Sequence, residues 1–543
     1  MVAMLSDDTI IDLLPAAAMA PDQLEEQFPP RALRAGAEVT RFAPSPTGYV
    51  HIGGIMVSLL AQSIARQTGG VFILRIEDTD QERYVPDAVN QLERALEYCG
   101  IVPDESGDVG RYGPYRQSAR QGIYDTYIAA LLRRGSAYPC FCTPEDLTEL
   151  SNRQRESGTP TGYWGPWARC RGMSQTDVTQ RLRSGASFVI RFAAPATEGE
   201  SRVQYVDLIR GPLELADNRN DVVIRKTGGL PTYHLAHPVD DYLMRVTTVV
   251  RADEWLPSVP LHLQLFDALK FPVPVYAHIA PLVKLEGRSR RKLSKRKDPE
   301  ATVDFYISAG YPSEGLLIYL RGLANSRLLD GLPDEVLAAP LRLQECSHSG
   351  ALVDLAKLEH ICRELVAEMP LEHLADRILD WASAYDADMS ARVRDDRGSV
   401  IRALGLSVGQ RKDICKWSDF RPKFGFLLTA LFEPVRNPAD ARFAPLSAEL
   451  VLEVAGRVAE TYRHEPDHDA WFAQIRRVAD ALGFAPTVRE FKQNRDGFKG
   501  SITEVARVVR VLLTGLRDSP DLFEVAQVLG EVEVRRRLSS LSA

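Results

Sequence analysis

The stretch RFAPSPTGYVHIGG, residues 41–54, decides the fold of this chain. It continues a short apolar run that begins at Val39 and predicts a strand, and its prolines and glycine predict a turn. Apolar residues then recur at helical spacing, at positions 55, 59, 60 and 64, so a helix should begin at HIGG. Gly53 and Gly54 would lie at its N-terminus, where free backbone N–H groups and the helix dipole favour a phosphate.

A second apolar run, GVFILRIEDTD at residues 70–80, completes a strand, helix and strand unit. It stays apolar until its acidic end, as expected of a parallel strand that is buried on both faces. Nucleotide sites in such sheets lie beyond the C-terminal ends of the strands. Neither GxGxxG nor GxxxxGK[ST] follows the first strand, which argues against a dehydrogenase and a P-loop ATPase.

The basic segment KLSKR, residues 292–296, lies far away in the sequence and is predicted to form the other half of one ATP site. Lys292 and Lys295 carry compact charges on flexible stems that can follow the phosphates from a mobile loop. The run 284–297 holds eight basic residues, and most such runs are solvated surfaces or nonspecific nucleic-acid patches. For Arg288, Arg290 and Arg291, solvent exposure and contact with an RNA backbone both stay open.

Several segments, in the same order along the chain, resemble class I glutamyl-tRNA synthetases, the glutamate–tRNA ligases. Besides residues 41–54 and 292–297 they are LRIEDTD at 74–80, YGPYRQS at 112–118, PCFC at 139–142, PTYHLA at 231–236 and VDDYLM at 239–244. An ordered set is far more specific than any single motif. The resemblance implies an α/β fold: a Rossmann-like parallel sheet with an inserted domain for the tRNA acceptor end, followed by an all-α region that binds the anticodon.

This organisation predicts the following segments: an N-terminal extension at 1–38, the catalytic domain at 39–115 and 222–283, an inserted domain at 116–221, the KLSKR loop with a tRNA stem contact at 284–345, and a helical anticodon-binding region at 346–543. Strand-like runs at 222–224 and 246–250 are expected to resume the parallel sheet. The extension should pack on the catalytic domain or stay mobile. Ser501 and Glu504 predict a capping box at the start of one C-terminal helix.

The resemblance implies that ATP, Mg²⁺, L-glutamate and tRNA(Glu) react through a glutamyl-adenylate, with charging of tRNA(Gln) left open. The residues that match the family as catalytic groups are His51, Lys292 and Lys295, and those for ATP binding are His51, Gly53, Gly54, Lys292, Lys295 and Arg296. Those for glutamate are Arg41, Ser45, Glu77, Tyr233 and Arg251. A guanidinium pairs with two carboxylate oxygens at once, so Arg251 is the prime candidate for the side-chain carboxylate. His51 taken alone could be an ordinary helix cap.

Three cysteines form a candidate zinc site. Cys140, Cys142 and Cys170 place three soft ligands on a short excursion of the chain. No histidine lies between Cys140 and Cys170, and family members with this metal complete the set with His or Tyr, so Tyr163 is a candidate fourth ligand. Three reduced, partly buried cysteines are an equally good interpretation, and Zn²⁺ here would be structural.

Composition limits the class of protein. With 543 residues, 45% of them hydrophobic, the chain can form several domains, and a net charge of -7 excludes a uniformly basic nucleic-acid binder. No apolar run approaches the length of a membrane span and no signal peptide is recognisable, while seven cysteines, an odd number, suit a reducing compartment. We therefore expect a soluble cytoplasmic protein that makes no membrane contact. We also expect a monomer, although these observations do not determine the oligomeric state.

Other functions stay open at this stage. An adenylating relative could transfer its acyl group to a modified tRNA base or a small amine, but the long helical C-terminal third favours recognition of a whole tRNA. A non-catalytic RNA-binding relative would not need His51, Lys292, Lys295 and Arg251 together. A glutamine-specific enzyme usually has PPEPNG where this chain has APSPTG at residues 43–48. The chain also departs from many relatives with IMVS at 55–58 and RADEW at 251–255.

Overall fold

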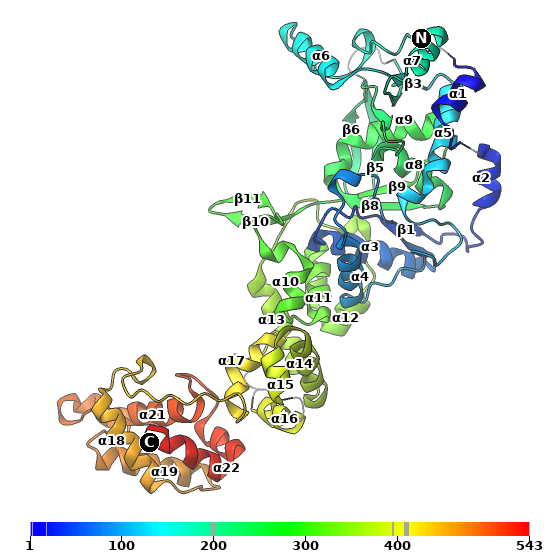
Figure 1. Ribbon diagram of the computed structural model, residues 1–543. Coiled ribbons are helices and arrows are strands. Elements are labelled where there is room, and N and C mark those ends of the chain that lie inside the picture. The colour runs from blue at the N-terminus through cyan, green and yellow to red at the C-terminus, as the bar shows by residue number, and fades with distance from the viewer. Residues whose placement is uncertain are drawn as a thin grey trace. The chain divides into compact units, whose positions relative to one another are not determined.

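The computed structural model describes residues 2, 4–17, 19–196, 201–393, 396–406 and 412–541 (Figure 1). The chain forms two compact units. The first comprises Met1–Phe305 and Leu317–Asp354, and the second comprises Tyr306–Leu316 and Leu355–Ala543. The boundary therefore falls within helices α10 (Val303–Ala309) and α11 (Ser313–Ala324), and the second unit takes in residues that we had predicted to belong to the segment 284–345.

A parallel sheet of four strands forms the centre of the first unit. Its order is β2 (Val71–Leu74), β1 (Val39–Phe42), β8 (Thr248–Ala252) and β9 (Val275–Ile279). All four residues of β1 are buried, as predicted for a strand with both faces covered. Because the strands are parallel, their C-terminal ends share one edge, and the residues that follow them meet there.

Helices cover both faces of this sheet. Thr40 of β1 donates to the carbonyl oxygen of Ala61 in α3 (Ile52–Thr68) at 2.7 Å. The next residue, Arg41, contacts Asp241 in α8 (Tyr233–Leu243) from the opposite face at 3.2 Å. Alternation along the strand thus places α3 on one face and α8 on the other. The second face is completed by α5 (Gln121–Arg133) and α9 (Val259–Leu269), and α4 (Ala88–Tyr98) follows β2 in the chain.

The described part of the N-terminal extension packs on the first unit. It forms α1 (Asp7–Leu13) and α2 (Pro21–Gln27), which lie against α5. The apolar side chains of Ile10, Leu24 and Phe28 are almost fully buried in the same core as α5, α8 and α9. Burial of these side chains is the main favourable term that holds the extension in place.

Among the described residues, the stretch 137–225 forms two antiparallel sheets and two α-helices. One sheet has the order β3 (Ala137–Cys140), β4 (Val189–Phe192) and β7 (Val223–Arg225), and the other pairs β5 (Arg202–Asp207) with β6 (Gly211–Ala216). The helices are α6 (Pro144–Glu156) and α7 (Gln175–Arg183).

Our prediction that residues 222–224 resume the parallel sheet was wrong. Strand β7 pairs with β4, with Arg225 opposite Ile190, and the parallel sheet resumes only at β8. Three residues can predict a strand, but they do not predict which strand it pairs with. Pairing depends on which other strand the tertiary fold brings beside it.

A hairpin and a short third strand follow the parallel sheet in the chain and belong to the first unit. The hairpin consists of β10 (Leu282–Glu286) and β11 (Ser289–Lys292), and β12 (Ala351–Leu352) pairs with β10. Helix α12 (Pro333–Ala338) lies in the intervening segment.

The second unit contains helices and no strand among its described residues. They are α13 (Leu355–Ala367), α14 (Leu371–Tyr385), α15 (Ala387–Val393), α16 (Arg397–Gly405), α17 (Phe420–Phe424), α18 (Ala448–Thr461), α19 (His468–Ala481), α20 (Val488–Gln493), α21 (Ile502–Thr514) and α22 (Leu522–Leu538). The predicted capping box at Ser501 and Glu504 is confirmed at the start of α21. Within the described residues, no helix has the length and apolar character needed to cross a membrane.

Candidate active site

His51 links the start of α3 to the KLSKR segment. Its Nδ1 accepts the backbone N–H of Gly53 at 2.9 Å, so the ring caps the helix, and its Nε2 lies 3.4 Å from the carbonyl oxygen of Leu293. The backbone N–H of Gly54 donates to the His51 carbonyl oxygen at 2.7 Å. The N–H groups of both glycines are therefore already bonded, contrary to our expectation that they are free for a phosphate.

The two glycines instead keep the start of α3 compact. A Cβ atom at Gly53 would lie 3.0 Å from His51 Nδ1, and one at Gly54 would lie 3.4 Å from the Phe42 ring. A side chain at Gly53 would thus push against the imidazole that the cap orients. If these glycines contribute to ATP binding, they would do so by holding His51 in place and by leaving space for its ring and for the ring of Phe42.

Backbone contacts hold the segments around His51 and KLSKR side by side. Val303 donates its N–H to the carbonyl oxygen of Val50 at 3.0 Å, and His51 forms a bridge with Thr302. Leu293 is buried, and its N–H donates to the Leu282 carbonyl oxygen at 2.9 Å. Two stretches about 240 residues apart in the chain therefore meet.

Asp298 organises the KLSKR loop. Its carboxylate accepts two N–H groups of Arg291, at 2.6 and 2.7 Å, and the backbone N–H of Ser294 at 2.9 Å. Arg291, whose role was open from the sequence, thus forms an ion pair within the protein. Lys284 adds a further ion pair to Glu300. This bracing shapes the loop that carries Lys292 and Lys295.

The cationic side of the site holds Lys292, Lys295 and Arg296, which are all exposed. Lys292 forms an ion pair with Glu254, which follows β8 in the 3-10 helix η4 (Asp253–Ser258). Burial lowers the pKa of His51, and the positive charges of Lys295 and Lys292 lower it further. His51 is therefore neutral near pH 7, and its cap on Gly53 keeps the Nδ1 lone pair for the helix.

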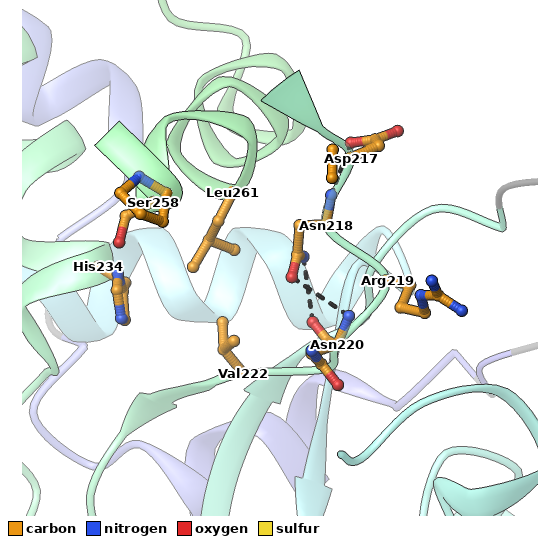
Figure 2. Close-up of a pocket in the computed structure, with 10 residues that line it drawn as sticks. Asp217, Asn218, Arg219, Asn220, Val222, His234, Ser258 and Leu261 are labelled. Atoms are coloured by element: carbon orange, nitrogen blue, oxygen red, sulfur yellow. Dashed lines mark hydrogen bonds between the residues drawn. The ribbon is translucent and has the colours of Figure 1, made fainter. Parts of the chain in front are cut away.

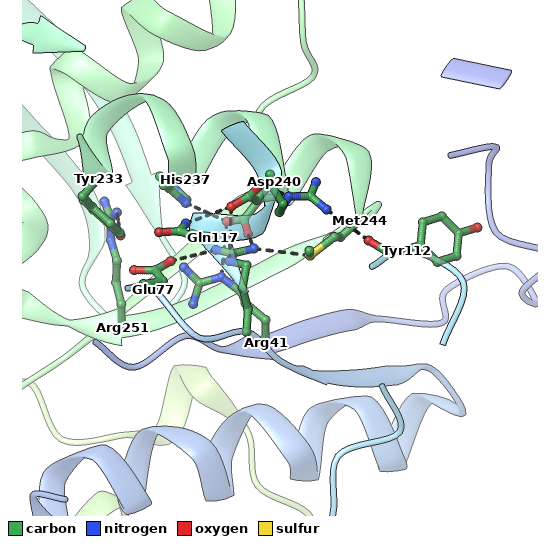
Figure 3. Close-up of polar contacts among 12 residues, drawn as sticks. Arg41, Glu77, Tyr112, Gln117, Tyr233, His237, Asp240, Met244 and Arg251 are labelled. Atoms are coloured by element: carbon green, nitrogen blue, oxygen red, sulfur yellow. Dashed lines mark hydrogen bonds and ion pairs between the residues drawn. The ribbon is translucent and has the colours of Figure 1, made fainter. Parts of the chain in front are cut away.

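A buried charge network lies at the C-terminal edge of the sheet (Figure 3). Arg75, with no exposed surface, contacts Asp241 at 2.6 Å and Glu77 at 3.0 Å. Asp241 also contacts Arg41 at 3.2 Å and His237 at 2.7 Å. The neighbouring Asp240 accepts from three further side chains at 2.7 to 2.8 Å: Gln117, Arg120 and Tyr124. The network fixes the positions of Arg41 and Glu77, which we had predicted to bind glutamate.

Glu77 is the carboxylate of this network with the least charge compensation. Burial raises its pKa to about 7, although Arg75 and Arg41 act in the opposite direction. The two arginines also hold Asp241, whose pKa is well below its usual range because they outweigh its burial. Glu77 is thus poised to gain a cationic partner, whereas Asp241 already has several.

Arg251 lies at the end of β8 and is buried, with 5% of its surface exposed. Its Nε donates to His278 at 2.9 Å and its Nη1 donates to the Tyr233 hydroxyl at 3.2 Å. Burial raises the pKa of Tyr233, and the nearby charges of Arg251, Glu77 and Arg41 also act on it. These four predicted residues therefore lie close together (Figure 3). Among the described residues, Arg251 forms no ion pair, which leaves its charge available to an anion.

Ser45 occupies the turn between β1 and α3. It is exposed, and its hydroxyl has no hydrogen-bond partner within the described parts of the chain. The preceding residue, Pro44, accepts the backbone N–H of Glu77 at 3.0 Å. Ser45 therefore belongs to a loop tied to the backbone of Glu77, next to the predicted amino-acid site.

Sequence reasoning missed most of the residues that support the site. The motif VDDYLM was recognised, but no role was assigned to Asp240 or Asp241, and Arg75 was not singled out. Two adjacent acids in an otherwise apolar helix are a signal that could have found them, because buried carboxylates need partners. Nothing in the sequence distinguishes His262 and His278 from ordinary core residues.

The candidate zinc ligands converge. The sulfur atoms of Cys140, Cys142 and Cys170 lie within 4.8 Å of one another, and all seven cysteines of the chain are free. The Tyr163 hydroxyl lies 3.5 Å from Cys140 Sγ and 3.3 Å from Cys142 Sγ. A hydrogen bond from Cys170 lowers the pKa of Cys140 below its ordinary value, so the cluster favours a thiolate at Cys140. Three thiols and a hydroxyl around one point suit a four-coordinate metal.

A polar cleft of about 350 Å³ opens beside His234 (Figure 2). It is lined by the loop 217–220, by His234 and by Leu261. His234 Nδ1 lies 3.3 Å from His262 Nε2, and His262 contacts Arg251. The loop is held by its own hydrogen bonds, among them one from Asn218 to Gln264 at 2.9 Å.

Comparison with known proteins agrees along the whole chain. The family of class I tRNA synthetases (E and Q), catalytic domain, matches residues 38–359, and an anticodon-binding domain family matches residues 489–541. Glutamate–tRNA ligases of Clostridium perfringens (strain 13 / Type A) and Sorangium cellulosum (strain So ce56) are each 38% identical to the chain, over 97% and 96% of its length and 98% of theirs.

A solved structure gives the same result for the fold. The crystal structure of a glutamate tRNA ligase from Elizabethkingia meningosepticum, in complex with its amino acid, superposes with a TM-score of 0.74 and 27% identity, covering 93% of this chain and 99% of that one. These matches confirm the predicted fold class and the family resemblance. The chain belongs to the class I tRNA synthetase family of glutamate and glutamine enzymes.

Proposed function

We propose that this chain attaches L-glutamate to tRNA(Glu) in an ATP-dependent reaction through a glutamyl-adenylate. Two observations carry this proposal: the cationic KLSKR loop contacts His51, and Arg251 is buried with no acidic partner among the described residues. The two parts are joined by a few residues, since Glu254, the partner of Lys292, follows Arg251 closely in the chain. Phosphate chemistry and recognition of a carboxylate are therefore expected at adjacent places.

The ATP half stabilises charge. An oxygen of the glutamate α-carboxylate attacks the α-phosphorus of ATP, and the bond from that phosphorus to the bridging oxygen breaks, releasing diphosphate. Lys292, Lys295 and Arg296 face the phosphates from the loop, and His51 faces them from the start of α3. Lys292 must exchange its ion pair with Glu254 for a phosphate oxygen when ATP binds. When bound with the ATP, Mg²⁺ would supply further charge compensation.

The amino-acid half recognises three charged groups. Arg251 pairs with the side-chain carboxylate and Tyr233 borders the same pocket, while Glu77 accepts the ammonium group. Arg41 and Ser45 bind oxygens of the α-carboxylate. The contact with Arg251 accounts for a preference for glutamate over glutamine, because the neutral amide of glutamine cannot supply the negative charge that a buried guanidinium requires.

The second step transfers the glutamyl group to RNA. A hydroxyl of the terminal adenosine of tRNA attacks the carbonyl carbon of the adenylate, the bond to the phosphate oxygen breaks, and AMP leaves. The second unit, with its match to an anticodon-binding domain at residues 489–541, would recognise the other end of the tRNA. We propose that one chain performs both steps as a monomer in the cytoplasm.

The cysteine cluster is proposed to hold a structural Zn²⁺. Cys140, Cys142 and Cys170 would supply thiolates, and Tyr163 would supply a fourth oxygen ligand. Cys140 ends β3 and Cys170 lies 28 residues beyond Cys142, so a shared metal would close the excursion that contains α6. The contribution would be to folding of the inserted segment, not to the chemistry of glutamate.

Aminoacylation with radiolabelled glutamate, using separately transcribed tRNA(Glu) and tRNA(Gln), tests the proposal. Incorporation into tRNA(Glu) alone supports a discriminating enzyme, and incorporation into both supports the broader specificity that the sequence leaves open. Incorporation into neither, together with AMP formation on another acceptor, would support the alternative of an adenylating enzyme with a different acceptor. Absence of both reactions would refute the proposed function.

A further inference from the structure

The guanidinium of Arg251 is bound entirely by uncharged groups. Its contacts are His278 Nε2 at 2.9 Å, the Tyr233 hydroxyl at 3.2 Å and His262 Nδ1 at 3.3 and 3.4 Å from its two Nη atoms. The ring of Tyr276 lies beneath it, 4.5 Å from Cζ. In contrast, the buried arginines of the adjoining network each hold a carboxylate: Arg41, Arg75 and Arg120. Arg251 alone among these four keeps an uncompensated charge.

The contacts of Arg251 determine the tautomers of both histidines. A guanidinium has five N–H donors and no acceptor, so the histidine nitrogens that face it must be unprotonated. The proton of His278 is therefore on Nδ1, which lies 2.6 Å from Asp207 Oδ2. The proton of His262 is on Nε2, 3.3 Å from His234 Nδ1.

Asp207 is itself held firmly. Its Oδ1 accepts the backbone N–H groups of Ile209 and Arg210, both at 2.9 Å, and the backbone N–H of His278 approaches both of its oxygens at 3.1 to 3.2 Å. The hydroxyl of Tyr205 donates to Oδ2 at 3.2 Å. These contacts give the carboxylate one orientation, and that orientation gives His278 one tautomer.

Both rings also stay neutral. Burial lowers the pKa of His278, and the nearby charge of Arg251 lowers it further, although Asp207 acts in the opposite direction. Burial lowers the pKa of His262 well below its usual range. A protonated ring would place an N–H and a second positive charge against the guanidinium, so neutrality preserves the acceptor on each ring.

We propose that Asp207 and His278 are positioning residues for glutamate. Asp207 holds the Nδ1–H tautomer of His278, and His278 accepts from Arg251 Nε, which aims the Nη atoms at the side-chain carboxylate of the substrate. The imidazole keeps the Asp207 charge one ring away from the guanidinium, so the cation is oriented without being neutralised. Four contacts serve five N–H donors, so at least one N–H remains for the substrate. This inference rests on the proposed role of Arg251.

Two substitutions of His278 separate positioning from general support. His278→Phe keeps a ring but removes the acceptor, and we expect the KM for glutamate to rise about 10- to 100-fold, the effect of losing a hydrogen bond to a charged group. The KM for ATP should change by less than about threefold. His278→Gln can offer an amide oxygen near the place of Nε2, and it should restore the KM for glutamate to within about threefold of the parent value.

Asp207→Asn tests the contact between Asp207 and His278 Nδ1 without changing Arg251 or the ring of His278. Because an amide can donate toward Nδ1, it no longer enforces one tautomer, and we expect the KM for glutamate to rise about tenfold with the KM for ATP unchanged. This variant and His278→Gln decide the question if His278→Phe cannot be recovered folded. An Asp207→Asn protein with the parent KM for glutamate would overturn the proposal.

Arg251→Gln distinguishes failure of this inference from failure of the proposed function. If Arg251→Gln raises the KM for glutamate but His278→Phe and Asp207→Asn do not, Arg251 binds the substrate without needing the pair, and the inference is wrong. If Arg251→Gln itself has no effect, the proposed role of Arg251 is wrong. If both His278→Phe and His278→Gln raise the KM for glutamate and the KM for ATP equally, His278 has a structural role only. That result would also overturn the proposal.

Discussion

The use of glutamate by this protein should fall steeply as the pH is lowered through neutrality. Glu77 is the proposed partner of the substrate ammonium, and burial raises its pKa to about 7 in the free protein. A carboxyl group with a raised pKa is neutral below that pH and ionised above it. Only the ionised form attracts the ammonium, so acid should weaken glutamate binding and leave ATP binding largely unchanged.

The size of the effect follows from the fraction of Glu77 that is ionised. With a pKa of about 7, this fraction falls from about nine-tenths at about pH 8 to about one-tenth at about pH 6. The kcat/KM for glutamate reports ionisation of the enzyme form that binds glutamate, so it should drop about tenfold across this range. The contribution of Arg75 and Arg41 is already contained in this pKa, since both favour the charged form.

The assay is aminoacylation at saturating ATP, Mg²⁺ and tRNA, with glutamate varied at each pH. Glu77→Gln should lower kcat/KM for glutamate about 10- to 100-fold at the alkaline end and abolish the acid limb, so that parent and variant converge as the pH falls. Glu105 provides a matched control, because this half-buried carboxylate is already paired with Arg31 at 2.8 Å. Glu105→Gln should keep the acid limb.

A kcat/KM for glutamate that stays flat between about pH 6 and about pH 8 would refute the reasoning, because it would mean that Glu77 is fully ionised or does not meet the ammonium. Persistence of the same limb in Glu77→Gln would assign the titration to another group.

Three further predictions concern single side chains. Lys295→Ala should slow adenylate formation about 100- to 1,000-fold in single-turnover experiments and leave the affinity for tRNA within about threefold. Lys297 is also exposed, and Lys297→Ala should barely change the rate of adenylate formation. An unchanged rate in Lys295→Ala would exclude the catalytic role of Lys295. Arg251→Gln should raise the KM for glutamate about 30-fold or more and leave the KM for ATP unchanged. Arg210 is the control, because its charge is already paired with Asp253 at 2.8 Å, and Arg210→Gln should leave both KM values within about threefold. Equal losses for both substrates in Arg251→Gln would contradict the role of Arg251. Metal analysis of protein purified without chelator should find about one Zn²⁺ per chain, and Cys170→Ser should reduce it; a value near zero in the parent would end the zinc proposal.

Much of the local structure could be predicted from the sequence because its signals are local. The apolar run before Arg41, the turn and the helical spacing after Gly54 predicted β1 and α3, and Ser501 with Glu504 predicted the cap of α21. Each signal depends on residues a few positions apart. The ordered motifs also predicted candidate residues for both the ATP half and the glutamate half of the site.

The misses have a common cause. Residues 222–224 were recognised as a strand, but their partner, β4, could not be read from three residues. The N–H groups of Gly53 and Gly54 were expected to be free, yet the His51 side chain accepts the first and the His51 carbonyl oxygen accepts the second. The first contact depends on the orientation of a side chain, which the sequence does not give. Arg291 was left open between solvent and RNA, and Asp298 holds it instead.

The amino-acid sequence by itself determined the parallel α/β core, the helical C-terminal third, the family and the candidate residues for ATP, glutamate and zinc. Tertiary structure alone decided which atoms join His51 to the KLSKR loop, that Arg251 has neutral histidines and no acidic partner among the described residues, and that Glu77 is buried enough to titrate near neutrality. The physical reason is distance. Periodicity and capping act over one or two turns of chain, whereas charge compensation, tautomers and pKa depend on atoms that folding brings within a few ångströms from remote positions.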